Sequence, residues 1–135
     1  MSSKVEPSRG CVTGPDVTLE AWRSAFADES GASFADLVEI DATLTGSALV
    51  GPMLGRDVVW KTLRRASGLY DSLEFTHEVR FGDRVYLEWN ARAFGLGIGG
   101  LTALSLNEAG RVSQIALHHR PFEAVTRFAD ALDQT

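Results

Sequence analysis

The stretch Leu73–Ala93, LEFTHEVRFGDRVYLEWNARA, decides the fold. Apolar and polar residues alternate along it on both sides of Gly82 and Asp83, which predicts two antiparallel strands, Leu73–Phe81 and Val85–Ala93. Each strand then has an apolar face directed at a core and a polar face directed at solvent. Other parts of the chain must cover the apolar face, and helices are the usual cover.

The flanking sequence supplies both helices and further strands. Strand alternation recurs in Val38–Ser47, Leu101–Leu106 and Val112–His119. Four segments have helical spacing: one from Asp16 through Phe26, one after Ser33 with the spacing of a capping box, Gly55–Ser67, and one that opens at Pro121 and runs through Leu132. This order predicts an α+β domain in which helices cover one side of a curved, mainly antiparallel sheet.

The composition fits one globular domain, because 44% of the 135 residues are hydrophobic and 23% are charged. We expect a flexible tail over residues 1–15 and a single domain over residues 16–135. The net charge of -5 argues against a nucleic-acid partner, which would need clustered positive charge. Cys11 has no second cysteine to pair with, no apolar run approaches the roughly 18 residues of a membrane span, and no signal peptide precedes the domain. The sequence therefore predicts a cytoplasmic protein with no membrane partner.

Three short motifs resemble the NTF2-like superfamily, which includes ketosteroid isomerases, limonene epoxide hydrolases and SnoaL-like polyketide cyclases. They are Leu54–Asp57 at the start of a helix, Glu108–Val112 before the last strand, and His118–Pro121 at the end of that strand. The resemblance covers about Val17 to Ala131 and implies a cystatin-like cone fold, with a bent sheet wrapped around N-terminal helices, a C-terminal helix and an apolar cavity open at one end. It carries little information about chemistry, since one fold hosts many functions.

The catalytic residues of the best-understood members are replaced in this sequence. Asp41–Thr43 matches the stretch that precedes the isomerase general base, but the base position itself falls on Gly46. The isomerase oxyanion-hole positions fall on Trp22 and Thr102. The epoxide hydrolase carboxylates and arginine align with Trp89, Ala91 and Leu117. Neither reaction is therefore expected of this chain.

The inward positions of the predicted strands and helices form a mainly apolar cavity, as in many small-molecule sites. The expected lining residues are Ile40, Leu44, Phe75, Trp89, Leu104, Ile115 and Leu117 from strands, and Trp22, Phe26 and Trp60 from helices. His77, Thr102, Ser113 and His119 are the polar interruptions.

His77 is the candidate general acid or base, because imidazole exchanges a proton near neutral pH, and Thr102 is a candidate hydrogen-bond donor. The alternative for His77 is a structural histidine held by the backbone or by water. A two-residue turn at Gly82 and Asp83 would place His77 opposite Glu88, as a dyad. The alternation instead favours a three-residue loop with a bulge, which separates the two side chains.

Two other motifs point to no cofactor. His118 and His119 are neighbours on a strand and face opposite sides, so with no third ligand evident we predict no metal site. Gly95–Gly100 matches the GxGxxG pattern, but a strand follows it where a dinucleotide site needs a helix. These glycines are expected to let the sheet bend.

Two functions remain open. The first is a pocket for a small hydrophobic molecule, carbonyl-bearing or polycyclic, with or without a cofactor-free isomerase, cyclase or dehydratase step through His77. The second is a non-catalytic dimeric interaction or ligand-sensing module whose cavity is filled by its own tryptophans. A homodimer is expected through the outer sheet face, with Tyr86, Phe94, Glu74, Glu88, Arg80 and Arg92 directed outward.

Overall fold

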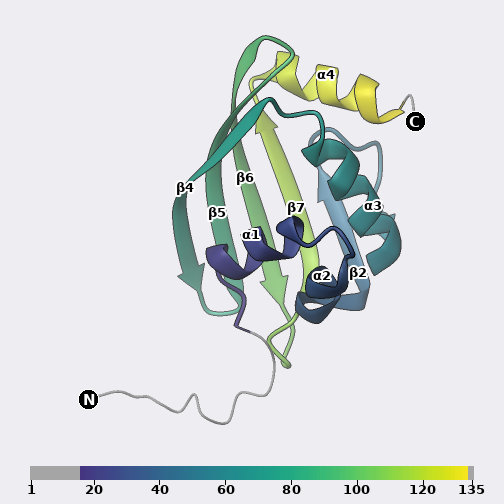
Figure 1. Ribbon diagram of the computed structural model, residues 1–135, viewed down its shortest axis with the longest axis vertical. Helices are drawn as coiled ribbons and strands as arrows, with labels where there is room; N and C mark the ends of the chain where they lie inside the picture. Colours follow the sequence, from purple (N-terminus) through teal and green to yellow (C-terminus); the bar gives the residue numbers. More distant parts are fainter. Residues whose placement is uncertain (1–15, 134–135) are drawn as a thin grey trace.

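The computed structural model describes residues 16–133, so the tail predicted for residues 1–15, with Cys11, lies outside the described residues. The helices are α1 (Leu19–Ala27), α2 (Ala32–Leu37), α3 (Arg56–Ser67) and α4 (Phe122–Asp133) (Figure 1). The strands are β2 (Val38–Gly46), β3 (Met53–Leu54), β4 (Ser72–Phe81), β5 (Arg84–Ala93), β6 (Leu96–Leu106) and β7 (Val112–Arg120).

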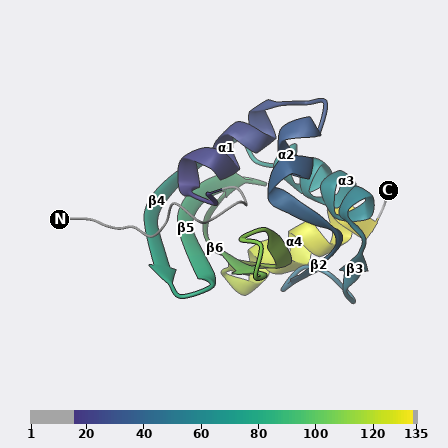
Figure 2. The same ribbon diagram turned by 90° about the horizontal axis from the view of Figure 1, so that it is seen from below.

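The strands form one curved sheet in the order β3-β2-β7-β6-β5-β4. Strands β4 to β7 follow one another as antiparallel neighbours, whereas β2 pairs with β7 in parallel. Figure 2 shows the sheet curling around α1, α2 and α3, which lie on its concave side. The predicted α+β architecture of a bent sheet around helices is confirmed.

Two hydrophobic clusters share the concave face. One joins α1, α2 and α3 to the sheet and contains the fully buried Phe34, Leu87 and Leu104. The other lies under α4 and contains Trp89 and Phe128. Because α4 covers one end of the sheet and α1, α2 and α3 cover the other, the sheet surface between them is left to line a cavity.

The connection between α1 and α2 is held by Asp28. Its carboxylate accepts hydrogen bonds from the backbone N–H groups and the hydroxyls of Ser30 and Ser33, at 2.7 to 3.1 Å. The short helix α2 thus takes its N-terminal acceptor from Asp28, and its N-cap residue, Gly31, makes no side-chain bond. The capping box predicted at Ser33 is wrong, because α2 begins at Ala32 and Ser33 already lies inside it.

We predict that the Asp28 contacts make stability depend on acid. Hydrogen bonds from Ser30 and Ser33 lower the pKa of Asp28 to about 2 from an ordinary value of 3.8. The ionised Asp28 therefore stabilises the fold fully above about pH 4, and this stabilisation is lost as the pH falls through about 2. Asp28→Asn should lower the melting temperature at pH 7, and the difference from the wild type should shrink toward pH 2, as followed by circular dichroism. A difference that is constant with pH would contradict this account.

Two arginines from the sequence motifs close the other end of α2. Arg111 donates to the carbonyl oxygens of Ala35, Asp36 and Val38 at 2.7 to 3.0 Å, and Arg56 donates to that of Val38 at 3.1 Å. Guanidinium groups are well placed there, because the last carbonyls of a helix have no partner inside the helix and carry partial negative charge. The motif residues thus fix α2 against the start of β2.

Strand β6 begins at Leu96, five residues before the predicted Leu101, and a short β3 that the sequence did not indicate pairs with β2. The glycines of Gly95–Gly100 are thus mostly inside a strand. The chain turns just before it, at Phe94 and Gly95, where φ is 57° and 74°. Phe94 was expected on the outer face, but it packs edge to face on Phe128, with ring centroids 5.1 Å apart.

A bulge at Thr76 interrupts β4. Phe75 is paired with Trp89 but His77 is paired with Glu88, so two steps along β4 match one step along β5. Side chains beyond a bulge change faces. Val79 and Phe81, predicted to point inward, are consequently 55% and 79% exposed.

The turn between β4 and β5 is the two-residue one, because Phe81 is paired with Arg84 and Gly82 has a φ of 61°. The three-residue loop expected from the alternation is wrong. The irregularity lies in the middle of the strand instead of at the turn. Beyond it Glu78 is on the helical side, where its carboxylate accepts from the backbone N–H of Leu19 at the start of α1, at 3.1 Å.

Candidate functional site

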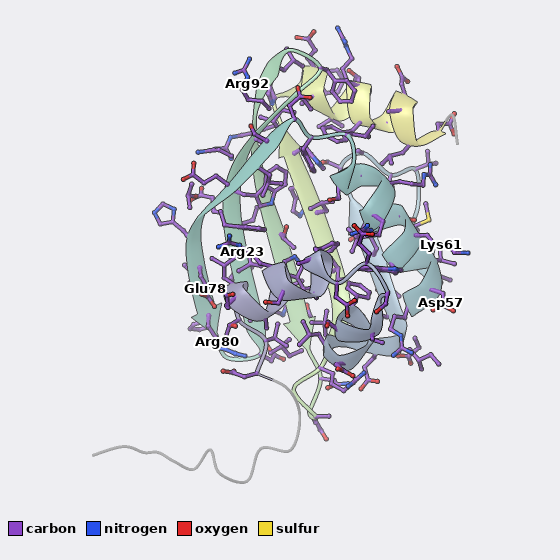
Figure 3. All side chains as sticks on the ribbon, in the orientation of Figure 1. Arg23, Asp57, Lys61, Glu78, Arg80 and Arg92 are labelled. Atoms are coloured by element: carbon purple, nitrogen blue, oxygen red, sulfur yellow. The ribbon has the colours of Figure 1, made fainter. Side chains whose placement is uncertain are left out.

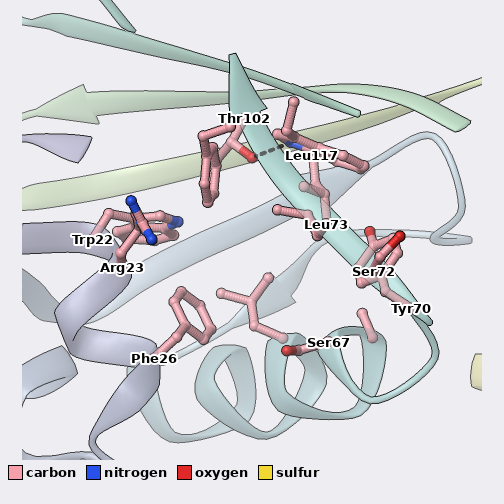
Figure 4. A pocket seen from close by; sticks show the side chains of 13 residues that line it. Trp22, Arg23, Phe26, Ser67, Tyr70, Ser72, Leu73, Thr102 and Leu117 are labelled. Carbon is pink, nitrogen blue, oxygen red and sulfur yellow. Dashed lines mark hydrogen bonds between the residues drawn. The ribbon is translucent and has the colours of Figure 1, made fainter. Parts of the chain in front are cut away.

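A cavity of about 360 Å³ opens between α1, the end of α3 and strands β4 to β7 (Figure 4). Most of its wall is aromatic or aliphatic, and the polar side chains that reach it carry hydroxyl, indole or guanidinium groups. It is lined by Trp22, Arg23, Phe26, Leu63, Ala66, Ser67, Tyr70, Ser72, Leu73, Phe75, Trp89, Thr102 and Leu117.

The structure brings six of the sequence-predicted residues to this cavity: Trp22, Phe26, Phe75, Trp89, Thr102 and Leu117. Leu44, Leu104 and Ile115 are instead sealed in the hydrophobic core. Trp60 packs against Phe34, with ring centroids 4.7 Å apart, and Ile40 is 71% exposed. Although these five were expected to line the cavity, none of them does. Four are packed in the core around the helices, whereas Ile40 faces solvent in the part of β2 where the pairing with β7 shifts register.

His77 lies on the outer face of the sheet, where 70% of its side chain is exposed. Its Nδ1 is 2.8 Å from a carboxylate oxygen of Glu88 and 3.2 Å from the Thr76 hydroxyl. The expected separation of His77 from Glu88 is therefore wrong, and so is the inward orientation of His77. The two-residue turn places His77 opposite Glu88, and the bulge at Thr76 puts His77 on the face opposite to that of Phe75, away from the cavity.

Thr102 is oriented by Trp89. The indole Nε1 of Trp89 donates to the hydroxyl oxygen of Thr102 at 3.0 Å, and both residues are buried. Since an indole N–H is only a donor, Thr102 must be the acceptor in this bond. Its own hydroxyl proton has no acceptor among residues 16–133, so it is available to a molecule in the cavity.

Tyr70 and His119 form a second polar pair, which the sequence did not reveal. The Tyr70 hydroxyl lies 2.6 Å from Nε2 of His119, and His119 is buried behind it, against Phe128 at a centroid distance of 4.5 Å. His119 was expected to line the cavity, but it reaches the cavity through Tyr70. The two residues are 49 positions apart, and Tyr70 lies between α3 and β4 where no periodic pattern marks it.

Both members of this pair are neutral at physiological pH. Burial lowers the pKa of His119 to about 4, with a smaller contribution from His118, and burial raises the pKa of the Tyr70 hydroxyl above its usual value of 10.0. The bond is therefore one between a phenol and a neutral imidazole, whose single ring proton lies on one of its two nitrogens.

The two tautomers of His119 would give Tyr70 different roles in this hydrogen bond. Nδ1 is buried and has no hydrogen-bond partner within the described residues. Buried N–H groups without an acceptor are rarer than acceptors left without a donor. With the proton on Nε2, His119 donates to the Tyr70 oxygen, and the Tyr70 hydroxyl proton is directed elsewhere. In the Nε2-protonated tautomer Tyr70 would have the same arrangement as Thr102, which accepts from the indole N–H of Trp89 and keeps its own proton for the cavity.

The charged residue at the cavity is Arg23, on the exposed side of α1 (Figures 3 and 4). Figure 3 places Asp57 and Lys61 on α3, away from it. Within the described part of the chain, no three His, Cys, Asp or Glu side chains lie together so as to hold a metal ion. None of the helices in residues 16–133 has the length and apolar character that crossing a bilayer requires.

The outer sheet face differs from the expected one in two residues: Phe94 is packed under α4, and Arg80 is paired with Val85 on the helical side. Tyr86, Glu88 and Arg92 keep the outward orientation. The homodimer through this face stays a prediction.

No family model matches the chain, and no curated protein matches it. Solved structures do. A steroid delta-isomerase from Pseudomonas aeruginosa is 19% identical with a TM-score of 0.77, and the match covers 86% of each chain. A Silicibacter pomeroyi protein with a cystatin-like fold is 23% identical with a TM-score of 0.74, over 82% of this chain and 77% of that one.

A third similar structure has a small molecule bound. It is a Catenulispora acidiphila protein with a ketosteroid isomerase-like fold, in complex with trimethylamine, and it is 19% identical with a TM-score of 0.62, over 91% of this chain and 99% of that one. A protein from Burkholderia xenovorans described as NTF-2 like also matches, with a TM-score of 0.61. The chain therefore has the NTF2-like, cystatin-like cone fold, as the sequence motifs predicted.

Proposed function

We propose that the cavity binds a small, largely apolar molecule that carries a carbonyl group. The volume of about 360 Å³ is within the range of small-molecule sites. The walls contributed by Trp22, Phe26, Phe75 and Trp89 favour an apolar body, because its surface leaves water on binding.

The observation that carries the carbonyl is the state of the two hydroxyls. Trp89 donates to the oxygen of Thr102 at 3.0 Å, which leaves the Thr102 hydroxyl proton for the cavity. His119, 2.6 Å from the Tyr70 hydroxyl, would do the same for Tyr70 when its proton is on Nε2. A carbonyl oxygen accepts such a proton, and an apolar ligand without an acceptor would leave it without a partner. The two hydroxyls can therefore orient and polarise a carbonyl.

The similar structures are in keeping with this ligand class. The Pseudomonas aeruginosa neighbour is named as a steroid isomerase, and a steroid is an apolar polycyclic molecule. The Catenulispora acidiphila neighbour holds a small organic molecule.

The cavity residues support binding and polarisation of a carbonyl more directly than proton abstraction. No carboxylate is among the lining residues that the structure describes, and His77 is on the opposite face of the sheet. Proton transfer through His77 is therefore not part of this proposal. The alternative of a cavity filled by tryptophans is disfavoured by the volume that remains beside Trp22 and Trp89.

A matched pair of compounds tests the carbonyl. 2-Acetylnaphthalene is a ketone. In 2-isopropenylnaphthalene a methylene group of similar size replaces the ketone oxygen. We expect isothermal titration calorimetry to show that Tyr70→Phe lowers the affinity for the ketone about fivefold relative to the affinity for the alkene. The reason is that one neutral hydrogen bond is worth about 1 kcal/mol. Thr102→Val should have an effect of the same size.

Tyr86→Phe is the matched control, because Tyr86 points to the outer face and should leave both affinities unchanged. A ketone-to-alkene affinity ratio that is the same in Tyr70→Phe, Thr102→Val and the wild type would refute the role of the hydroxyls. If neither compound binds, the proposed ligand class is refuted.

A further inference from the structure

We infer that the ligand of this cavity carries, besides its carbonyl, an anionic group such as a carboxylate at the end that faces solvent, and that Arg23 binds this group. The inference rests on the proposed function, and it concerns the chemistry of the ligand at the cavity mouth.

The charge distribution around the cavity is the first support. Arg23 is the charged side chain among the lining residues, in a chain whose formal net charge is -5. An anion approaching this protein is repelled overall, so a site for an anion needs a local cation. Arg23 supplies one at the rim, and no carboxylate among the described residues lines the cavity to offset it.

The position of Arg23 is the second support. On α1 it lies beside Trp22 and three residues before Phe26, both of which line the cavity, while Arg23 itself is exposed. Figure 4 shows the guanidinium at the edge of the aromatic wall, with Ser67 and Ser72 at the other side of the opening. A ligand whose apolar body covers Trp22 and Phe26 would therefore bring its outer end to the Arg23 guanidinium.

The lack of an internal partner is the third support. Within residues 16–133, Arg23 forms no ion pair and no side-chain hydrogen bond. Other arginines of the fold are engaged: Arg56 and Arg111 hold the end of α2, and Arg64 donates to the carbonyl oxygen of Phe26 at 3.0 Å. Glu78, also next to α1, accepts from the N–H of Leu19. The Arg23 guanidinium thus keeps its donors for a planar anion, with which it forms paired hydrogen bonds.

Two keto compounds of equal size test the inference. They are 6-acetyl-2-naphthoic acid, which is anionic at pH 7, and the neutral 6-acetyl-2-naphthamide. We expect calorimetry to show the acid binding about fivefold more tightly than the amide, as for a partly exposed ion pair. Arg23→Gln should remove this preference, so that the acid and the amide bind with equal affinity, and added salt should weaken the binding of the acid to the wild type selectively.

Lys61→Gln is the control, because it removes the same charge from an exposed position on α3 that does not line the cavity. It should leave the preference for the acid intact. If 2-acetylnaphthalene binds but the acid is no tighter than the amide, or if the preference survives in Arg23→Gln, the anionic group is refuted and the proposed carbonyl site stands. If 2-acetylnaphthalene, the acid and the amide all fail to bind, both are refuted.

Discussion

Gly100→Ala should lower the free energy of unfolding by about 3 kcal/mol, near the upper end of the usual cost of overpacking a core. A methyl group at Gly100 would fall inside the indole ring of Trp89, which lies flat on this glycine across the β5–β6 pair. Trp89 is 1% exposed, and moving out of its place would break its hydrogen bond to Thr102. We therefore expect the variant to lose ligand binding as well as stability.

Gly97→Ala is the matched control on the same strand. A methyl group there would come no nearer than 3.7 Å to the Arg92 guanidinium, so the substitution should change stability by less than about 0.5 kcal/mol. Urea denaturation followed by circular dichroism measures both variants. Adding Trp89→Leu to Gly100→Ala should cost less than the sum of the separate changes, because the smaller side chain accepts the methyl group. Equal stabilities of the two alanine variants would contradict this packing.

His119 should make the protein less stable in mild acid, by about 3 kcal/mol between pH 7 and pH 4. Its pKa is about 4 in the folded protein against an ordinary 6.5, because burial disfavours the charged ring. Between these values the unfolded chain binds a proton that the folded chain does not, so unfolding takes up a proton and is favoured as the pH falls. The stability that neutral His119 contributes is fully lost below about pH 4. The Asp28 effect sets in only at lower pH.

His119→Gln should remove most of this slope, since an amide does not titrate and still offers an N–H to the Tyr70 hydroxyl. His118→Gln, on the exposed neighbouring position, should retain it. Urea denaturation at pH 7, 6, 5 and 4 compares the three proteins. If the pH dependence of stability disappears in His118→Gln and persists in His119→Gln, it is due to His118, and the prediction is contradicted.

The strands and helices could be predicted because their patterns are local. The alternation of Val85–Ala93 and the helical spacing of Gly55–Ser67 correspond closely to β5 and α3. Gly97, Gly99 and Gly100 concealed the first half of β6, because glycine has no side chain to show which face of a strand it belongs to. Gly100 is required there by the Trp89 ring, a contact between neighbouring strands that no single segment records.

The part of the site that depends on local strand patterns could be predicted as well. Trp89 and Thr102 follow from the faces of β5 and β6, and they line the cavity. His77 was placed on the wrong face because a bulge leaves no mark in an alternation that continues unbroken on both sides of Thr76. Tyr70 was missed because its role depends on His119, and only the folded chain brings these two residues together.

The same bulge affects how this protein meets other copies of itself. Strand β4 is ten residues long and forms an edge of the sheet, with most of its side chains exposed. A straight edge strand of this length is a template on which a further strand can pair, and such pairing leads to aggregation. The bulge at Thr76 breaks the even spacing of the outer N–H and C=O groups, and Glu74, Glu78 and Arg80 place charges along the rest. The irregularity that turns His77 outward therefore also protects the open edge of the sheet.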